Sequence, residues 1–341
     1  MTTTSANTGM GRRSYIFFLV AVIALAACAP RLQPLGPDVT QSMTPQLTVD
    51  SFTTRDGVAL PARRWLPDGA PRGVIIALHG FNDYGNAFAD IGTFLASHGI
   101  AVIAYDQRGF GAAPQPGIWP GRQILSADFR DVLAATRAAY PGVPVHALGE
   151  SMGGGVLMAA WAQTPYPVDS VILVAPAVWG RATMPFYQTA ALWMTTYTTP
   201  WLRVSGGGLK RQPSDNIEML RALGRDPLVI KETRVDAIWG ITNLMDDALA
   251  GAGRFTAPSL ILYGAKDDIV PARATLDMLA SLPPPSAPRK VAIYDTGFHM
   301  LLRDLEAETF WRDILAWLDN PTDGLPSGAD SVDPVRALAA R

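Results

Sequence analysis

A serine near the middle of the chain stands in a pattern that is typical of a catalytic nucleophile. Residues 149–153 read Gly-Glu-Ser-Met-Gly, the one GxSxG of the sequence. The apolar run 145–148 precedes this pentapeptide, and a helical stretch, 154–163, follows it. A serine on a sharp turn between strand and helix projects its hydroxyl out of the sheet, and the free N–H groups at the helix start stabilise a developing oxyanion. The pattern therefore predicts acyl transfer through Ser151.

A serine hydroxyl becomes an effective nucleophile only with a base in hydrogen-bond reach, itself oriented by a carboxylate. His299 lies in a loop after the last predicted strand, where a parallel sheet opens a crevice at the carboxyl ends of its strands, and it is the expected base. Structural roles are available to the other three histidines, which are His79, His98 and His146. Asp267 and Asp268 follow the predicted strand 259–263, and either could orient His299.

Short apolar runs alternate with helical stretches over most of the chain. The runs are residues 73–78, 101–105, 145–148, 171–174, 259–263 and 291–294. The helical stretches are residues 87–98, 124–140, 154–163, 272–281 and 305–318. Apolar runs that alternate with helices indicate a parallel sheet buried on both faces. Two segments, 47–53 and 60–66, are expected to be antiparallel strands. The sequence thus predicts an α/β fold with a mostly parallel central sheet flanked by helices.

Residues 178–253 interrupt this alternation and are interpreted as a helical cap inserted after the sixth predicted strand. The cap divides the predicted core into residues 46–177 and 254–319. Residues 320–341 are rich in Pro, Gly, Asp and Ser and are expected to be a flexible tail.

The first part of the predicted cap is rich in aromatic residues and has no acid between Val178 and Ser214. Its aromatic residues are Trp179, Phe186, Tyr187, Trp193, Tyr197 and Trp201. Together they favour an apolar tunnel or a membrane-touching surface suited to an acyl chain, although packing on the core explains each of them singly. Basic residues of this region could meet a lysophospholipid phosphate or form a solvated face. They are Arg181, Arg203, Lys210 and Arg211.

The first residues of the chain have the layout of a secretory signal. Residues 1–27 contain no acid, carry two arginines and then run apolar. The apolar run is shorter than the ~20 residues of a membrane-spanning helix, so a cleaved signal is favoured. Residues 25–28 read Leu-Ala-Ala-Cys and resemble the lipobox of bacterial lipoproteins, in which the cysteine becomes the acylated first residue. The alternative is an ordinary cleaved signal, and a buried core thiol is the structural explanation for Cys28.

Lipidation at Cys28 would anchor the protein in the bacterial cell envelope, with residues 28–45 as a tether to the core. Ala29 rather than Asp follows the cysteine. By resemblance to enterobacterial sorting rules, this indicates the outer membrane. The predicted partners are therefore a membrane, through the lipid anchor, and a small lipid or ester substrate.

Five segments resemble the motifs of one enzyme family. They read HGFND (79–83), AYDQRGFG (104–111), GESMGG (149–154), YGAKDDIVP (263–271) and GFHMLLRD (297–304). In this order they resemble the α/β-hydrolases, in the branch of monoacylglycerol lipases and lysophospholipases, over most of residues 46–318. The set of motifs is more specific for the fold than for the substrate.

The resemblance implies a role for each matching residue. The implied catalytic triad is Ser151, Asp267 and His299. The backbone N–H groups of Phe81 and Met152 are implied to form the oxyanion hole, and Asp268 is a solvated neighbour of the acid. The loop 106–109 is implied to be structural, and Glu150 is interpreted as a variable residue of the turn rather than an acid catalyst.

The predicted function is a serine carboxylic-ester hydrolase that acts on acyl esters, monoacylglycerol or lysophospholipid, through an acyl-enzyme. No metal or organic cofactor is expected. A serine aminopeptidase of this fold is an alternative, but such enzymes place cap carboxylates for the substrate ammonium. A dehalogenase would need Asp in place of Ser151. A non-catalytic envelope lipoprotein that reuses the fold is a further alternative, for which a broken triad is the expected mark.

Composition excludes other classes of function. The formal net charge is -2 and the isoelectric point is about 6.1, so no basic field is available for nucleic acid. With one cysteine and no CxxC or HExxH, the sequence has no recognisable zinc site. The oligomeric state is left open.

Overall fold

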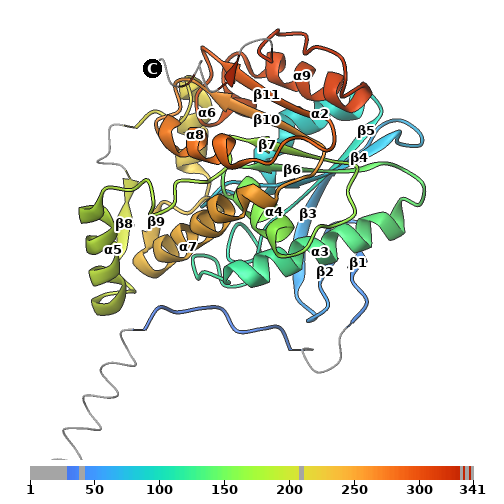
Figure 1. The fold of residues 1–341 in the computed structure, drawn as a ribbon. Coiled ribbons are helices and arrows are strands. Elements are labelled where there is room, and N and C mark those ends of the chain that lie inside the picture. The colour runs from blue at the N-terminus through green and yellow to red at the C-terminus, as the bar shows by residue number, and fades with distance from the viewer. Residues whose placement is uncertain (1–28, 38–42, 207–210, 331–332, 335–337, 339–341) are drawn as a thin grey trace, which may run out of the picture.

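The computed structural model of the chain describes residues 29–37, 43–206, 211–330, 333–334 and 338. Cys28, Lys210 and the predicted signal lie outside the described residues. Figure 1 shows a central sheet with helices on both faces. Within the described ranges, no helix combines the length and the apolar character that crossing a membrane requires.

A nine-stranded sheet forms the centre of the fold, in the order β1-β2-β3-β5-β4-β6-β7-β10-β11. Its strands are β1 (Gln46–Leu47), β2 (Ser51–Thr53), β3 (Ala59–Trp65), β4 (Gly73–Leu78), β5 (Ile100–Tyr105), β6 (Val145–Glu150), β7 (Ser170–Val174), β10 (Ser259–Gly264) and β11 (Arg289–Tyr294). The strands from β5 to β11 in this order pair parallel, and β1, β2 and β3 extend the sheet antiparallel. The predicted, mostly parallel α/β sheet is confirmed.

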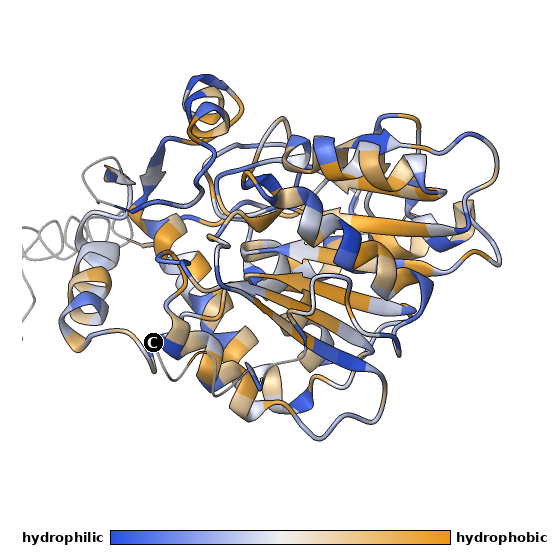
Figure 2. Ribbon diagram, turned by 90° about the horizontal axis from the view of Figure 1, so that it is seen from above, coloured by the Kyte–Doolittle hydropathy of each residue, from blue (hydrophilic) through white to orange (hydrophobic). Residues whose placement is uncertain are grey.

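Helices bury both faces of this sheet. Every residue of β4, β5, β7 and β10 is buried, which explains their continuous apolar sequence. One face packs against α3 (Arg122–Ala139), α4 (Met152–Gln163) and α8 (Ala272–Ser281). The other packs against α2 (Ala89–Ser97), which follows the 3-10 turn Gly85–Phe88, and α9 (Ala307–Asp319). In Figure 2 the strands at the centre are mostly orange, the colour of hydrophobic residues.

Residues 46–53 form a hairpin rather than the single strand that the alternation predicted. Leu47 pairs with Phe52 across the turn. The Thr48 hydroxyl accepts a hydrogen bond from the Ser51 N–H (3.1 Å), a local side-chain contact that favours a turn. Because of this extra strand, the strand before the predicted cap is β7, the seventh of the structure.

Residues 178–253, the predicted cap, contain elements of two kinds. They hold α5 (Phe186–Thr198), α6 (Ile217–Arg225), α7 (Val235–Gly251), the 3-10 turn Ala252–Arg254 and a ribbon of β8 (Arg203–Ser205) with β9 (Glu232–Arg234). α7 packs on α4 and buries Leu244 and Ala248 in the core. It therefore completes the helix layer of the core, whereas α5 packs on the outer side of α7.

Residues 29–37 lie against the folded domain, although the sequence predicted a tether. Gln33 is buried, and its backbone N–H donates to the Trp119 carbonyl (3.0 Å). Its side-chain amide donates to three further carbonyls, those of Pro114, Gln115 and Ile118. The Gly36 N–H donates to the Asp56 carboxylate (2.8 Å). The prediction of a tether was wrong for this stretch because one glutamine finds partners that are distant in the sequence.

Residues 320–330 are also folded, so the prediction of a flexible tail was wrong for them. Leu325 is buried against the α9 side of the sheet. Asp330 forms an ion pair with Lys290 of β11 (2.9 Å), and the Ala329 carbonyl accepts the N–H of Ile293 (3.3 Å). This segment covers the β11 edge of the sheet.

If the segment stabilises the fold, Leu325→Ala will lower the free energy of unfolding by about 2–4 kcal/mol, because it leaves a cavity in a packed cluster. Urea denaturation measures this change. Leu305→Ala is the matched control, since Leu305 is 71% exposed, and it should change stability by less than about 0.5 kcal/mol. Equal stabilities of the two variants would contradict the packing described for residues 320–330.

Candidate active site

Ser151 lies on the turn between β6 and α4 with φ of 51° and ψ of -113°. Such a conformation costs a non-glycine residue about 1–3 kcal/mol and persists only where its surroundings enforce it. The Ser151 N–H donates to the Val174 carbonyl (2.9 Å). A Cβ atom on Gly149 would lie 2.5 Å from the Gly153 backbone, and one on Gly153 would lie 2.0 Å from the Leu78 carbonyl oxygen. The spacing of the two glycines is therefore a steric requirement of the turn.

The structure brings Ser151, His299 and Asp267 together. His299 Nε2 lies 3.0 Å from Ser151 Oγ, and His299 Nδ1 lies 2.8 Å from Asp267 Oδ2. The other carboxylate oxygen of Asp267 accepts the N–H groups of Ile269 (2.8 Å) and Val270 (2.9 Å), which fix its orientation. These contacts leave Nδ1 protonated and direct the lone pair of Nε2 at the serine hydroxyl.

Asp268, the rival acid, points elsewhere. Its Oδ2 accepts the N–H of Gln212 at 3.0 Å, so it contacts the segment between β8 and α6. The geometry therefore favours Asp267 as the partner of His299.

His299 is buried, and burial disfavours its protonated form. The charge and hydrogen bond of Asp267 outweigh this effect and raise the pKa of His299 above its ordinary value. Glu150 raises this pKa further, and Arg303 opposes it. Because its pKa is raised, the imidazole is a stronger base and accepts the serine proton more readily.

The predicted oxyanion groups lie on the two segments that flank Ser151. Met152 is the first residue of α4, where the N–H groups have no acceptor within the helix. Phe81 follows Gly80, which passes so close that a Cβ atom on it would lie 3.9 Å from Ser151 Oγ. Both residues come shortly after the carboxyl ends of neighbouring strands. Met152 follows β6, and Phe81 follows β4.

His79 fixes the segment that carries Phe81. The ring is fully buried, and burial lowers its pKa, so the imidazole is neutral. Nε2 accepts the N–H of Gln107 (2.9 Å), which leaves Nδ1–H to donate to the Gly80 carbonyl (2.8 Å). The Gln107 side chain donates to the His79 carbonyl (2.8 Å). His79 thus has the structural role that its position predicted.

The loop 106–109 also has structural contacts. Asp106 accepts from Arg63 (2.7 Å) and from the N–H of Gly85 (2.9 Å). The Arg108 guanidinium is buried between Asp56 (2.8 Å) and Asp128 (2.7 Å). Neither residue lines the cavity that contains Ser151.

A buried charged cluster, which the sequence patterns did not predict, lies beside Ser151, His299 and Asp267. Arg303 Nη1 is 2.8 Å from Asp83 Oδ2, and its Nη2 is 3.2 Å from Glu150 Oε2. All three side chains line the cavity of Ser151. Glu150 Oε1 is buried and, among the described residues, has no hydrogen-bond partner. The signal was distributed over three motifs, HGFND, GESMGG and GFHMLLRD, each of which contributes one charge.

Ser151 and His299 open into a cavity of about 490 Å³. Its apolar lining comes from α6, the segment before β9, and the two loops that carry the acid and the base. In addition to Phe81 and Pro213, the apolar residues are Leu223, Val229, Ile230, Ile269 and Met300. The charged cluster of Asp83, Glu150 and Arg303 lines the same cavity. The cavity therefore offers a ligand both an apolar surface and a polar one.

A family profile described as "Hydrolase_4: Serine aminopeptidase, S33" matches residues 69–306. The chain belongs to this family. It is 25% identical to a monoacylglycerol lipase of Mycolicibacterium smegmatis, over 79% of this chain and 95% of that protein. It is also 25% identical to the monoglyceride lipase of Rattus norvegicus, over 80% of this chain and 90% of the relative.

Solved structures share the fold of this family member. A monoacylglycerol lipase of Paleococcus ferrophilus superposes with a TM-score of 0.66 at 22% identity, covering 77% of this chain and 99% of that one. A soluble variant of the monoglyceride lipase of Saccharomyces cerevisiae, in complex with a substrate analog, gives 0.68 at 19% identity, covering 85% and 100%. The predicted α/β-hydrolase fold is confirmed.

The geometry predicts that a fluorophosphonate probe will label Ser151 and that labelling will depend on the pKa of His299. Protonated His299 cannot accept the serine proton, so the rate should fall as the pH falls through a pKa above 6.5, the ordinary value. Mass spectrometry identifies the labelled residue, and quenched time courses give the rate of labelling. Ser151→Ala should abolish labelling.

Glu150→Gln removes a negative charge that favours the imidazolium, so the acidic limb of the labelling profile should move to lower pH. Glu308→Gln, a change of the same kind on the exposed face of α9, is the control and should leave the limb in place. Identical profiles for both variants would refute the influence of Glu150 on His299.

Proposed function

We propose that the protein is a serine carboxylic-ester hydrolase that acts on acyl esters, with monoacylglycerol as the preferred substrate. The observation that carries this proposal is the hydrogen-bonded series Ser151, His299, Asp267 at the wall of an apolar cavity. The relatives named as monoacylglycerol or monoglyceride lipases support it.

In this mechanism Ser151 Oγ attacks the ester carbonyl while His299 Nε2 accepts the hydroxyl proton. The developing oxyanion is stabilised by the N–H groups of Phe81 and Met152. His299 then returns the proton to the departing alcohol, and Asp267 stabilises the imidazolium throughout. Water, activated by the same imidazole, hydrolyses the acyl-enzyme and regenerates Ser151.

The cavity lining favours monoacylglycerol over a lysophospholipid. The apolar residues suit an acyl chain, and the buried cluster suits a head group with hydroxyl donors. Asp83 and Glu150 carry two negative charges against the one positive charge of Arg303, and Glu150 Oε1 is an unused acceptor. A glycerol hydroxyl can donate to this oxygen, whereas a phosphate diester has no proton to donate to it and would compete with Asp83 and Glu150 for Arg303.

The same carboxylates favour a second candidate, an aminopeptidase-like activity. A substrate ammonium could pair with Glu150 Oε1. The description of the matching family includes serine aminopeptidase. This candidate requires an acyl group that carries its ammonium near the cluster.

A panel of substrates tests the proposal, with the full chain in a non-ionic detergent. We expect kcat/KM for monooleoylglycerol to exceed that for lysophosphatidylcholine by about tenfold or more, which corresponds to about 1.4 kcal/mol of transition-state free energy. Glu150→Gln should reduce kcat/KM for monooleoylglycerol more than for p-nitrophenyl butyrate, which has no glycerol. Glu308→Gln is the matched control.

Four outcomes would overturn the proposal. Preference for alanine p-nitroanilide over all esters would favour the peptidase. Preference for the lysophospholipid would reject the role of the cluster in head-group selection. Full ester turnover by Ser151→Ala would reject the mechanism. Failure of the wild-type chain to react with the fluorophosphonate would favour the non-catalytic lipoprotein.

We further propose that residues 1–27 are a signal that is removed and that Cys28 is then acylated, which anchors the protein in the bacterial envelope at the outer membrane. The sequence of residues 25–28 supports this proposal. Expression in a bacterial host with an alkyne-labelled palmitate should label the wild type and not Cys28→Ser. Equal label in both proteins would defeat the proposal, and Ala29→Asp should move labelled protein between membranes.

A further inference from the structure

α5 exposes an unusual number of large apolar side chains. Phe186 is 85% exposed, Trp193 58% and Met194 56%. Tyr187, Tyr197, Trp201 and Leu202 are each at least 46% exposed on the same helix or just after it. No charged residue occurs in residues 182–202. We name this surface, from Phe186 to Leu202, the α5 face. Single exposed apolar residues are ordinary, but a contiguous set without charge indicates a surface that is covered in use.

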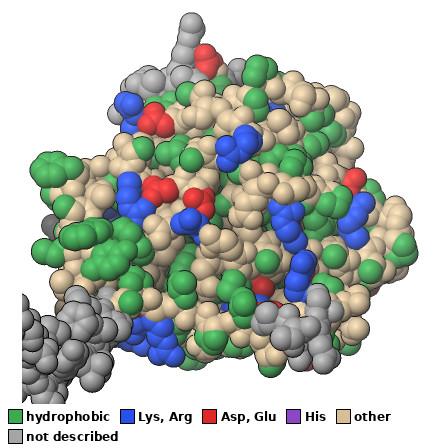
Figure 3. All heavy atoms as spheres, turned by 60° about the horizontal axis from the view of Figure 1, so that its bottom comes forward, with side chains coloured by type: hydrophobic (Ala, Val, Ile, Leu, Met, Phe, Trp, Pro, Cys, Tyr) green, Lys and Arg blue, Asp and Glu red, His purple; other side chains and the backbone are tan. Residues whose placement is uncertain are grey.

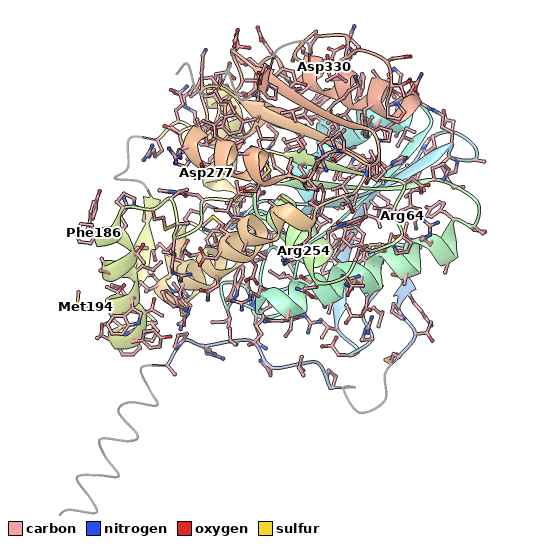
Figure 4. All side chains as sticks on the ribbon, in the orientation of Figure 1. Arg64, Phe186, Met194, Arg254, Asp277 and Asp330 are labelled. Carbon is pink, nitrogen blue, oxygen red and sulfur yellow. The ribbon has the colours of Figure 1, made fainter. Side chains whose placement is uncertain are left out.

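The α5 face points away from the domain. Of the helix residues, Thr196 alone is buried, and Tyr197 contacts Trp239 of α7 edge-on with ring centroids 5.9 Å apart. Figure 4 shows Phe186 and Met194 directed outward from α5. In Figure 3 hydrophobic side chains gather at the left, the side on which Figure 1 places α5. These side chains therefore do not contribute to the core.

An open groove of about 520 Å³ lies along the same helix. Its apolar lining includes Met184, Phe186, Trp193 and Trp239. The Arg181 guanidinium stacks over the Trp239 ring, 4.0 Å from its centroid, and pairs with Asp246, so the nearest charges neutralise each other. A groove of this lining suits a hydrocarbon chain.

The N-terminal segment ends beside the α5 face. The Arg31 N–H donates to Asp236 Oδ2 (3.1 Å), and the Asp236 N–H donates to the Pro200 carbonyl at the end of α5 (3.1 Å). Cys28 precedes Arg31 by three residues in the sequence, and three residues of extended chain span at most about 10 Å. Shortly after Arg31, the hydrogen bonds of the Gln33 side chain hold the chain against the domain.

From this juxtaposition, we propose that the α5 face docks on the surface of a lipid bilayer. Trp and Tyr are the residues that favour the boundary between hydrocarbon and headgroups. Exposed Arg31 and Arg203 flank the face and can meet anionic headgroups. In the sequence, the apolar residues 15–27 precede Arg31. A bilayer covers the face and receives this stretch or an acylated Cys28, whereas a second protein copy would account for the face alone.

A short stretch of chain joins the α5 face to the cavity of Ser151. The chain passes from α5 through the short strand β8 to Gly206, which lines that cavity. The surface itself does not depend on the proposed ester hydrolysis.

Binding to vesicles of phosphatidylethanolamine and phosphatidylglycerol tests the proposal, with the chain from residue 28 onward, which the proposed cleavage leaves, carrying Cys28→Ser so that neither the apolar residues 15–27 nor an acyl anchor contributes. Vesicle flotation gives the partition coefficient. We expect the triple variant Phe186→Ser, Trp193→Ser, Met194→Ser to lower it by about tenfold or more, because the contact depends on buried apolar area. A control triple variant alters three remote side chains of similar exposure, Val49→Ser, Leu66→Ser and Leu305→Ser, and should bind like its parent.

Hydrogen exchange supplies the second measurement. Vesicles should slow exchange of the amides in residues 186–202 and leave those of residues 301–305 unchanged. Equal partition of the two triple variants would overturn the proposal, as would protection of α5 that rises with protein concentration when no lipid is present, the mark of a second copy. Hydrolysis of p-nitrophenyl butyrate is measured in parallel. Its absence in an α5-dependent vesicle binder would reject the esterase and leave the surface standing.

Discussion

The candidate site depends on one close backbone contact, between the start of α4 and the carboxyl end of β4. Gly153 lies so near the Leu78 carbonyl that any side chain would overlap it. This approach allows Ser151 to hold a positive φ and to leave the sheet at a sharp angle. It also aligns the first N–H of α4 with the segment that follows β4. The candidate nucleophile and the predicted oxyanion donors are therefore positioned by the same contact.

The parallel sheet brings the remaining groups to this point. β10 and β11 pair in register and end together, so the loops that carry Asp267 and His299 emerge side by side. The serine follows β6, which is two strands from β10 and three from β11, and the loop after β11 is long enough to reach it. Burial of His299 would weaken it as a proton acceptor if the carboxylate did not offset that cost. The position of His299 and its raised pKa thus both depend on Asp267, which the sheet brings to the same edge.

Local sequence patterns were enough to predict the parallel strands, the turn at Ser151 and the neighbourhood of His299, because each depends on nearby residues. The spacing left Asp267 and Asp268 open, since both follow the same strand; the family resemblance implied Asp267, and the structure places that residue beside His299. The cluster around Arg303 joins residues far apart in the sequence, and no spacing rule detects such pairs. The two terminal segments were misjudged for the same reason, because their composition is that of a linker while single side chains bind them to the domain.

The segment 320–330 has a consequence for how the molecule meets its neighbours. An outermost strand with unpaired N–H and C=O groups invites a strand from another chain. Here the Ala329 carbonyl occupies the N–H of Ile293 on β11, and the opposite margin of the sheet is β1, only two residues long. Both edges of the sheet are therefore poor sites for the addition of a strand from another chain. This lowers the tendency of the protein to aggregate through β-pairing at high concentration.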